Sequence, residues 1–388
     1  MKSFASHRTA LNALFLHYPF SGTGRYLSNL IGHVGGQASL TLIGAAAFPP
    51  VESATPRLHR TLETPFDGRQ RQLAKVWFEQ VALPAAAAQC KVDVVHNPYF
   101  AAPVVPRVPT IVTVHDLVPI VRPEYRRTAA QRLYTHLVCR GLKAASRIIT
   151  DSDASAQDLR KLLGVSDERI RVIPLGVDDR FRPLESASEQ EWAYSILARY
   201  RIERPYLLYV GGLDQRKNVD GLVRAFSRLK RERGIPHVLV IVGRVRAGDP
   251  LFYDPRADLE RLGIEDLVYL LGPVEDDEVR ALHTQSDAFV FPSAYEGFGL
   301  PPLEAMACGE PVVCSSASSL PEVVGEAGIL FDPTNDDELV DALWRIVSDA
   351  DLRRDLGTRG HERAMQFTWE RTVRATLAVW EEVSRERR

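Results

Sequence analysis

The sequence lacks several features that would mark a particular class of protein. Its 388 residues include only four cysteines, and these form no CxxC pair and have no histidine cluster nearby. This spacing argues against a structural zinc site and a disulfide framework, and it suits a reducing cytosol. The formal net charge is only -2, so no overall charge attracts nucleic acid, and we expect no nucleic-acid partner. The cysteines are Cys90, Cys139, Cys308 and Cys314.

Long hydrophobic runs are also missing. The apolar stretch from Leu11 to Leu16 is interrupted by Asn12, which makes it too short and too polar for the core of a signal peptide. We interpret it as a first buried strand. No segment has the length that crossing a bilayer requires. These absences favour a cytoplasmic protein and leave a peripheral position at the inner membrane surface open.

The sequence does contain the pattern of an α/β fold, repeated twice. Hydrophobic residues make up 45% and charged residues 25% of the chain, as in globular proteins. Short, continuously apolar runs alternate with amphipathic stretches of helical length, which predicts parallel strands buried on both faces. We therefore expect two doubly wound, Rossmann-like domains. The expected strands are Ala13–His17, Leu40–Ile43, Val92–His96, Thr110–Val114, Ile148–Thr150, Arg171–Ile173, Tyr206–Val210, Val238–Val242, Val268–Leu271, Ala288–Phe291, Pro311–Cys314 and Gly328–Phe331.

Composition also predicts the domain boundaries. We expect a first domain over residues 1–182, a linker over 183–204 that is rich in proline, serine and charge, and a second domain over 205–365. A C-terminal helix from about Thr368 to Glu382 has a strongly apolar face that needs a partner, so we assign 366–388 to the first domain. Open parallel sheets bind ligands at the carboxyl ends of their strands. The site is therefore expected in the cleft between the domains.

The densest cluster of informative residues is PSAYEGFGLPPLEAMACG, residues 292–309. Gly297 and Gly299 let the backbone approach a ligand, and Pro301 suits the first turn of a helix. The N–H groups before that helix form an anion site that the helix dipole reinforces. Glu296 and Glu304 bracket this site and can accept hydrogen bonds from sugar hydroxyls. A loop acid and a helix cap are the plainer alternative, but the glycines and prolines in register favour a ligand.

A second cluster, YVGGLDQRKN, follows the first strand expected in the second domain. Arg216 and Lys217 lie just before a helix, where the helix dipole favours acids instead of cations. An anionic ligand would supply the missing negative charge, and the arginine fork suits phosphate oxygens. The alternative is a solvated start of a helix.

The first half offers two weaker candidates. His115, with Asp116 beside it, follows a buried strand and can orient a sugar, although a structural histidine is the alternative. The loop over residues 19–26 contains Gly22 and Gly24, whose amides can face a phosphate or an acceptor. It is not a dinucleotide fingerprint, because Leu27 stands where the third glycine belongs.

Together these residues resemble glycosyltransferase family 4, a large group of retaining enzymes with the two-domain GT-B fold. The similarity extends from the Gly22-Thr-Gly24 loop to Trp369 and so covers nearly the whole chain. Its most specific element is the Glu-x7-Glu spacing from Glu296 to Glu304, and the stretch SLPEVVGEAG at 319–328 strengthens it.

The resemblance implies a role for each matching position. Glu296 is expected to contact the hydroxyls of the donor sugar and Glu304 the ribose. Arg216 and Lys217 would stabilise the leaving diphosphate, and His115 would approach the transferred sugar. Further expected donor contacts are Gly22, Gly24, Gly212, Gly243, Arg244, Val274, Phe298, Gly299 and Leu300. Expected acceptor-side residues are Arg25, Tyr26, Asn97, Tyr99 and Asp116.

One position departs from the family pattern. Many members carry an arginine where Gly212 stands here, and we expect Arg216 to take over that charge. The stretches YVGGLDQRKN, VHDLVPI and HNPYF are similar to the mannosyltransferases that extend bacterial surface polysaccharides. The resemblance implies transfer of a hexose to a glycan or lipid-linked saccharide. It favours GDP-mannose as the donor and leaves UDP-glucose and other donors open. It implies neither a cofactor nor a metal.

Three other interpretations of these residues stay open. Asp151-Ser152-Asp153 resembles the DxD metal motif of another transferase fold, but its place between a strand and a helix favours capping. A glycoside hydrolase would use Glu296 and Glu304 as acid and nucleophile, although the two neighbouring cations would then have no task. A non-catalytic nucleotide-sugar sensor would bind the same donor without transferring it.

The segment over residues 122–147 is basic and amphipathic. It suits an anionic membrane surface and a lipid-linked acceptor, or else a solvated helix with one buried face. Its cations, opposed only by Glu124, are Arg122, Arg126, Arg127, Arg132, Arg140, Lys143 and Arg147.

Overall fold

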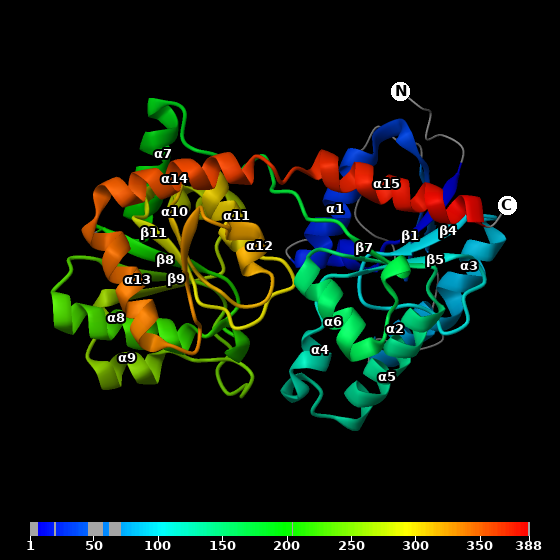
Figure 1. The fold of residues 1–388 in the computed structure, drawn as a ribbon, viewed down its shortest axis with the longest axis horizontal. Helices are drawn as coiled ribbons and strands as arrows, with labels where there is room; N and C mark the ends of the chain where they lie inside the picture. Colours follow the sequence, from blue (N-terminus) through cyan, green and yellow to red (C-terminus); the bar gives the residue numbers. More distant parts are fainter. Residues whose placement is uncertain (1–6, 19–20, 46–56, 62–70, 204, 387–388) are drawn as a thin grey trace. The chain divides into compact units, whose positions relative to one another are not determined.

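The chain divides into two compact units. The computed structural model describes residues 7–18, 21–45, 57–61, 71–203 and 205–386. One unit consists of Met1–Gly176 together with Trp369–Arg388, and the other consists of Val177–Thr368. Each unit is built around its own parallel sheet with helices on both faces (Figure 1).

The described part of the first unit has a sheet of seven parallel strands in the order β3-β2-β1-β4-β5-β6-β7. The strand order reverses between β1 and β4, so the chain winds outward in both directions from this point. All residues of β4 and β5 are buried, as expected for strands covered on both faces. The bounds are β1 Arg8–Asn12, β2 Ser39–Gly44, β3 Arg57–Thr61, β4 Val94–Asn97, β5 Thr110–Val114, β6 Arg147–Thr150 and β7 Ile170–Val172.

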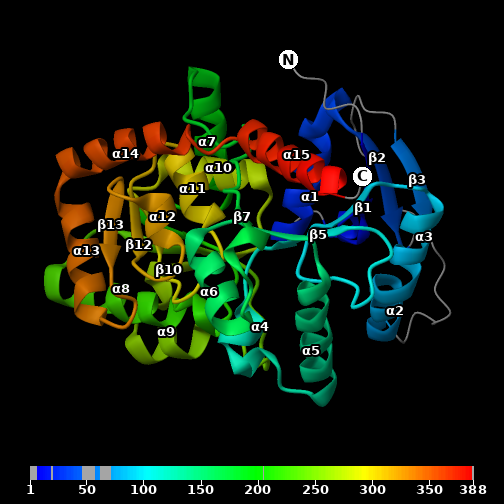
Figure 2. The ribbon, with the colours of Figure 1, turned by 45° about the vertical axis from the view of Figure 1, so that its right-hand side comes forward.

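Helices cover both faces of this sheet (Figure 1). On one face lie α1 (Gly22–Val34) and the C-terminal helix α15 (Trp369–Glu386), which lie side by side (Figure 2). The Trp380 indole N–H of α15 donates to His96 Nδ1 of β4 over 3.1 Å. The expectation that the last helix belongs to the first domain is therefore confirmed. The other helical elements are η1 Leu14–His17, η2 Gly35–Gln37, α2 Arg71–Trp77, η3 Phe78–Ala82, α3 Leu83–Gln89, α4 Val118–Val121, η4 Pro123–Tyr125, α5 Ala129–Ala144, α6 Asp153–Leu163 and η5 Asp167–Arg169.

The second unit has a six-stranded parallel sheet in the order β10-β9-β8-β11-β12-β13. Here the strand order reverses between β8 and β11. The strands are β8 Tyr206–Val210, β9 Val238–Val242, β10 Val268–Gly272, β11 Ala288–Phe291, β12 Val312–Ser315 and β13 Gly328–Phe331. The helical elements are α7 Ala187–Arg199, η6 Gln215–Lys217, α8 Val219–Arg233, α9 Arg256–Leu262, η7 Glu265–Leu267, α10 Asp276–Gln285, α11 Leu300–Ala307, α12 Leu320–Val324, α13 Asp336–Ser348 and α14 Ala350–Ala364.

The first strand lies earlier in the chain than the sequence predicts. The expected strand Ala13–His17 is wrong, because β1 ends at Asn12 and Leu14–His17 forms the short helix η1. The Asn12 carboxamide oxygen accepts from the amide of Leu14 over 3.0 Å, and this local bond turns the chain out of the sheet. Strand β3 was not expected either, since its sequence RLHRT is polar and basic.

The segment expected as a linker, residues 183–204, contains helix α7, which Ser186 caps. Ala193 and Ile196 of this helix pack with Ala281 of α10 in a small hydrophobic cluster. The structure assigns this segment to the second unit, with residue 204 outside the described residues. Among the helices that the structure describes, none is long and apolar enough to cross a membrane.

Candidate active site

The two sequence clusters of the second unit come together because their strands are neighbours. Strand β8 pairs with β11 through Ala288↔Leu207 and Phe289↔Leu208. The loop after β8 carries Arg216 and Lys217, and the loop after β11 carries Glu296. The carboxyl ends of parallel strands meet at one edge of a sheet, and a reversal of strand order opens a crevice there. Residues about 80 positions apart therefore meet at this crevice.

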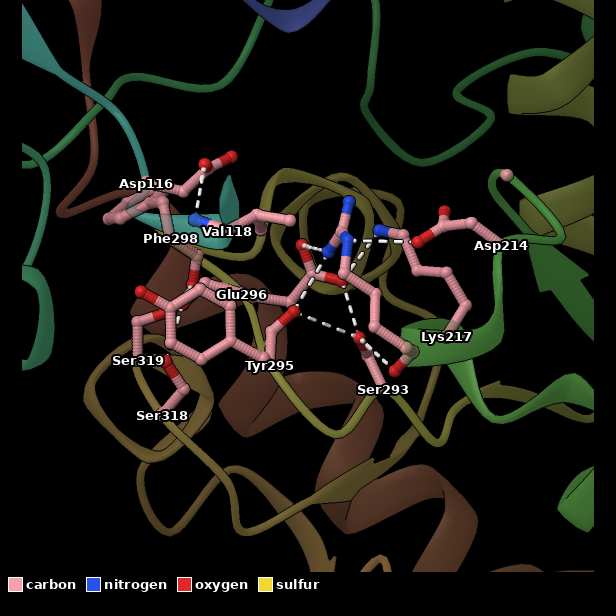
Figure 3. A network of polar contacts seen from close by, with 12 residues as sticks. Asp116, Val118, Asp214, Lys217, Ser293, Tyr295, Glu296, Phe298, Ser318 and Ser319 are labelled. Carbon is pink, nitrogen blue, oxygen red and sulfur yellow. Dashed lines mark hydrogen bonds and ion pairs between the residues drawn. The ribbon is translucent and has the colours of Figure 1, made fainter. Parts of the chain in front are cut away.

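Glu296 bridges both cations (Figure 3). Its Oε1 lies 2.5 Å from Lys217 Nζ, and its Oε2 lies 3.0 Å from Arg216 NH1. The Ser293 hydroxyl donates to Glu296 Oε1 over 2.6 Å. Arg216 Nε also lies 2.9 Å from an oxygen of Asp214. Two cations and two carboxylates thus form one compact cluster. Asp214, which the sequence reasoning missed, stands two residues before Arg216 in the same motif.

Backbone contacts fix this cluster in place. The Ala294 amide donates to the Arg216 carbonyl over 2.7 Å, and the Arg216 guanidinium donates to the Tyr295 carbonyl over 2.8 Å. The hydroxyls of Ser318 and Ser319 donate to the Glu296 carbonyl over 2.6 and 3.0 Å. Both strand-end loops are therefore tied together by their main chains as well as by charge.

The cluster is nearly buried, and this changes its titration. The side chains of Lys217 and Glu296 are only 9% and 12% exposed. Burial alone would raise the pKa of Glu296, but Lys217 and Arg216 outweigh it and hold that pKa at about 2. Burial lowers the pKa of Lys217, although Glu296 partly opposes the shift. Glu296 is therefore a fixed anion at neutral pH.

The start of helix α11 lies directly after this cluster. Gly299 is its N-cap, with φ of 125°, and prolines occupy the second and third helical positions. A Cβ on Gly299 would lie 2.9 Å from Leu320 Cδ2, so both its backbone angle and its surroundings require glycine. The amides of Gly299 and Leu300 stand at the positive end of the helix, and Glu304 lies buried one turn further on.

The remaining donor residues expected in the second unit line the same sheet edge. Gly243 follows β9, and a Cβ there would lie 2.1 Å from the Gly211 carbonyl oxygen, so only glycine allows this approach of two strand-end loops. Its neighbour Arg244 is exposed. Val274, after β10, is half-buried, and a Cβ on Gly212 would meet only an Asp214 oxygen at 3.2 Å.

In the first unit, His115 is held by both of its ring nitrogens. Its Nδ1 donates to Asp151 Oδ2 over 2.7 Å, and its Nε2 donates to the Pro98 carbonyl over 3.1 Å. The Pro98 carbonyl can only accept, and the ionised carboxylate of Asp151 accepts as well, so this pair of contacts favours a ring that is protonated at both nitrogens. Burial by itself lowers the pKa of His115, but Asp151 outweighs it and the pKa lies above its usual value. The Tyr26 ring packs edge-on against His115, with centroids 4.9 Å apart.

Three expectations in the first unit need correction. Residues 22–24 are not a flexible loop but the first turn of α1, and the Gly24 amide already donates to the Ser21 hydroxyl oxygen. The first two residues of that expected loop, 19 and 20, lie outside the described residues. Tyr26 and Asn97 are each only 1% exposed, so neither side chain faces an acceptor. Tyr26 instead contacts Thr113, and Asn97 accepts from Asn12.

Of the other acceptor-side residues, Asp116 is half-buried and Tyr99 is buried. Arg25 is half-buried in the first turn of α1. Tyr99 and Asp116 line a pocket in the first unit together with His115. An oxygen of Asp116 accepts from the Val118 amide over 3.0 Å at the start of α4.

The Asp151-Ser152-Asp153 motif divides between two tasks. Ser152 is the N-cap of α6, where its hydroxyl oxygen accepts from the Ser155 amide over 3.1 Å, so the capping expectation is confirmed. Asp151 is buried against His115, a contact that the sequence reasoning missed. Strands β5 and β6 are neighbours, and this pairing brings the two residues together.

Comparisons with known proteins identify the family of the chain. Residues 198–363 match the family described as glycosyl transferases group 1, and residues 20–181 match glycosyltransferase family 4. O-antigen chain mannosyltransferase B of Escherichia coli is 30% identical over 381 residues, which cover 94% of this chain and 97% of that protein. The MMP alpha-(1->4)-mannosyltransferase of Mycolicibacterium hassiacum is 33% identical over 289 residues, which cover 70% of this chain and 65% of that protein.

A solved structure shows the same fold. Sucrose-phosphate synthase from Thermosynechococcus elongatus superposes with a TM-score of 0.75 at 22% identity, covering 97% of this chain and 99% of that chain. Two doubly wound units with these matches define a glycosyltransferase of the GT-B fold. The chain belongs to glycosyltransferase family 4.

Proposed function

We propose that this enzyme transfers a hexose, preferably mannose, from a nucleotide-diphosphate sugar to a glycan or lipid-linked saccharide. We further propose that the anomeric configuration is retained and that no metal is needed. The observation that carries the proposal is the cluster in which Glu296 bridges Arg216 and Lys217 beside the start of α11.

The diphosphate would bind between the two cations and the start of α11. Arg216 offers a planar fork for phosphate oxygens and Lys217 offers a point charge. The amides of Gly299 and Leu300 add the positive end of the helix. Together these groups can stabilise the charge that develops on the leaving diphosphate, a task that a divalent cation fulfils in other transferases.

The two glutamates would hold the sugars on either side of the diphosphate. Glu296 stays ionised, with a pKa of about 2, so it can accept hydrogen bonds from hydroxyls of the hexose. We assign Glu304 to the ribose and the Gly243, Arg244 and Val274 edge to the base. His115 would orient the transferred sugar and not remove a proton, because both of its ring nitrogens already contact groups of the first unit, Asp151 and the Pro98 carbonyl.

The preference for mannose rests on relatives. The E. coli protein that shares 97% of its length with this chain is a mannosyltransferase of O-antigen chains, and the M. hassiacum relative is also a mannosyltransferase. We therefore propose GDP-mannose as donor, with UDP-glucose as the second candidate. We propose a polysaccharide acceptor because the E. coli relative is named for O-antigen chains, with a lipid-linked saccharide as the alternative.

The titration of Glu296 argues against a glycoside hydrolase. The general acid of such an enzyme needs a raised pKa, so that it keeps its proton until the leaving group takes it. Glu296 has a lowered pKa and is tied to two cations. It is therefore unsuited to donating a proton.

The test is release of nucleoside diphosphate in the presence of EDTA, with GDP-mannose or UDP-glucose as donor and a mannose-terminated oligosaccharide as acceptor. We expect faster release from GDP-mannose and an α-linked product by NMR. Lys217→Gln and Glu296→Gln should each lower kcat by roughly 10²–10³-fold. Exposed Lys161→Gln and Glu362→Gln are the matched controls and should leave kcat unchanged. Full activity of both site variants, or an inverted product, would contradict the proposal.

We also propose that α5 rests on an anionic membrane surface. Arg132, Arg140 and Lys143 are exposed on this helix, and so is the large apolar side chain of Leu133, at 71%. Cations beside an exposed leucine suit a headgroup layer. Binding to phosphatidylglycerol vesicles but not to phosphatidylcholine vesicles in co-sedimentation, and its loss in Arg132→Glu/Arg140→Glu, would support this. Equal binding to both vesicle types would overturn it.

A further inference from the structure

The first unit contains a pocket of about 240 Å³. This volume lies near the lower end of the roughly 300–1,000 Å³ of pockets for drug-sized ligands, and it gives room for one sugar ring. Segments far apart in the sequence form its walls: α2, the residues after β4 and β5, and α5. The lining residues that matter here are Lys75, Tyr99, Phe100, His115, Asp116 and Tyr134.

Lys75 is surrounded by aromatic rings. Its Nζ lies 5.0 Å from the ring centroid of Tyr134, 5.4 Å from that of Tyr99 and 5.9 Å from that of Phe15. Rings at such distances attract a cation through their negative faces. The lysine side chain is nonetheless 35% exposed, so its N–H groups remain within reach of a ligand in the pocket.

A buried acid holds this lysine in place. Glu79 lies in η3, a π-helical turn between α2 and α3, and such turns are frequent at functional sites. Its Oε1 lies 3.7 Å from Lys75 Nζ. The hydroxyls of Tyr99 and Tyr134 donate to its carboxylate over 2.8 and 3.0 Å. The acid therefore orients both tyrosines. Burial raises the pKa of Glu79, and Lys75 opposes that shift; in its ionised form the carboxylate compensates the charge of the lysine.

The charges around the pocket leave no surplus cation. Lys75 is balanced by Glu79, and His115 is balanced by Asp151. Among the lining residues that the structure describes, Asp116 then adds one negative charge. A phosphate or carboxylate would meet no uncompensated positive charge here. A neutral ligand carries no such penalty.

We infer that this pocket binds the uncharged terminal sugar of the acceptor and that Lys75 is a specificity-determining donor to its hydroxyls. A pyranose ring has an apolar C–H face and a rim of hydroxyls. Tyr134 and Phe100 supply aromatic surface for the face, and Lys75 with Asp116 supplies a donor and an acceptor for the rim. This inference rests on the proposed transferase function, since the site also contains His115, which would orient the transferred sugar.

Binding can be measured without catalysis by titrating the full chain with methyl α-D-mannopyranoside and with mannose 6-phosphate in saturation-transfer NMR. We expect the mannoside to bind at least fivefold more tightly than the phosphate. Lys75→Met and Tyr134→Leu should each weaken mannoside binding about tenfold, because each removes a charged donor or an aromatic wall. Exposed Lys161→Met should change nothing. Equal binding to wild type and both variants would overturn the inference.

A second variant tests the charge balance of the pocket by removing a negative charge, whereas Lys75→Met removes a positive one. Glu79→Gln keeps the shape of the side chain and an acceptor for the tyrosine hydroxyls but leaves the charge of Lys75 uncompensated. We expect mannose 6-phosphate to bind this variant at least fivefold more tightly than it binds wild type. The double variant Lys75→Met/Glu79→Gln should lose that gain. If phosphate affinity is unchanged in Glu79→Gln while the variant melts as a folded protein, the charge argument is wrong.

Measurements with the donor substrate show whether a negative result refutes only the acceptor pocket or the proposed function itself. GDP binding and slow hydrolysis of GDP-mannose report the second unit and should persist in the exposed control variant Lys161→Met. If they persist while the mannoside fails to bind wild type, only the acceptor pocket is refuted. If GDP and GDP-mannose do not bind at all, the proposed function fails first.

Discussion

Glu296 should make the stability of the second unit depend on pH in a direction that the structure fixes. The perturbation is Glu296→Gln, which keeps the shape of the side chain but removes its charge. At neutral pH this variant leaves Lys217 and Arg216 without the carboxylate that both contact. Removing one partner of a buried ion pair typically costs about 3–5 kcal/mol.

The pH dependence follows from the lowered pKa of Glu296. Its value falls from 4.5 to about 2 in the folded protein, which corresponds to about 3 kcal/mol of stabilisation at 1.36 kcal/mol per pH unit. A carboxylate with a lowered folded pKa contributes this stability fully above its unfolded pKa. The contribution is lost as the pH falls from about 4.5 through about 2. The stability gap between wild type and variant should therefore shrink by about 3 kcal/mol over this range.

Hydrogen exchange read by mass spectrometry tests this for the second unit alone, through peptides that cover β8 and β11. Opening free energies are compared between wild type and Glu296→Gln at pH 7, 5, 4 and 3. The exposed α14 residue Glu362 provides the matched control, and Glu362→Gln should match wild type at every pH. A gap that is as large at pH 3 as at pH 7 would refute an ionised, paired Glu296.

Three further predictions concern the first unit. Gly141→Ala should lower the melting temperature by several degrees, because its new Cβ would lie 2.1 Å from a backbone carbonyl oxygen; an unchanged melting curve would contradict this. Trp380→Phe removes the donor to buried His96 and also part of a fully buried ring, so it should cost at least about 1–3 kcal/mol in urea unfolding; an unchanged free energy of unfolding would contradict this. NMR titration should place the pKa of His115 above 6.5 in wild type and should find it lowered in Asp151→Asn, where only Asp116 and the Pro98 carbonyl still oppose the effect of burial. The His115–Asp151 pair then stabilises wild type fully below pH 6.5, and this contribution is lost as the pH rises through the folded pKa.

The sequence predicts the strands of the second unit well because each of them has a clear hydrophobic pattern. Runs such as Tyr206–Val210 and Ala288–Phe291 are continuously apolar and bounded by glycine or proline, and both coincide with strands. Once two such strands are neighbours, the loops that follow them must meet. Arg216 and Glu296 could therefore be placed in one site without any knowledge of their contacts.

What the sequence does not contain is the pairing of charges within the site. Glu296 was expected to face a sugar and Arg216 a diphosphate, yet in the structure these side chains bind each other. Likewise Asp151 seemed to belong only to a capping motif, since its contact with His115 depends on the pairing of β5 with β6. Lys75 and Glu79 have the i,i+4 spacing that is common for ion pairs on helices. The pair indicates a binding site only because the fold places aromatic rings from other elements around Lys75.

The balance of charge around Arg216 leads to a last prediction, on the affinity for the nucleoside diphosphate. Asp214 pairs with Arg216 through Nε, so Arg216 and Lys217 are opposed by two carboxylates even before an anion arrives. Asp214→Asn removes one of these negative charges and keeps a hydrogen-bond acceptor for the guanidinium. Two unit charges about 4 Å apart interact by about 1 kcal/mol even in bulk water, and this lower bound corresponds to about fivefold in affinity.

GDP should therefore bind Asp214→Asn about fivefold more tightly than wild type in isothermal titration calorimetry. Turnover should fall if release of the product limits it, because the same charge favours departure of the diphosphate. The exposed α13 variant Asp341→Asn shares the change in net charge without the contact and should bind GDP as wild type does. Weaker binding of GDP by Asp214→Asn would contradict this prediction. It would mean that the Asp214 carboxylate orients Arg216 for the diphosphate and does not repel the diphosphate.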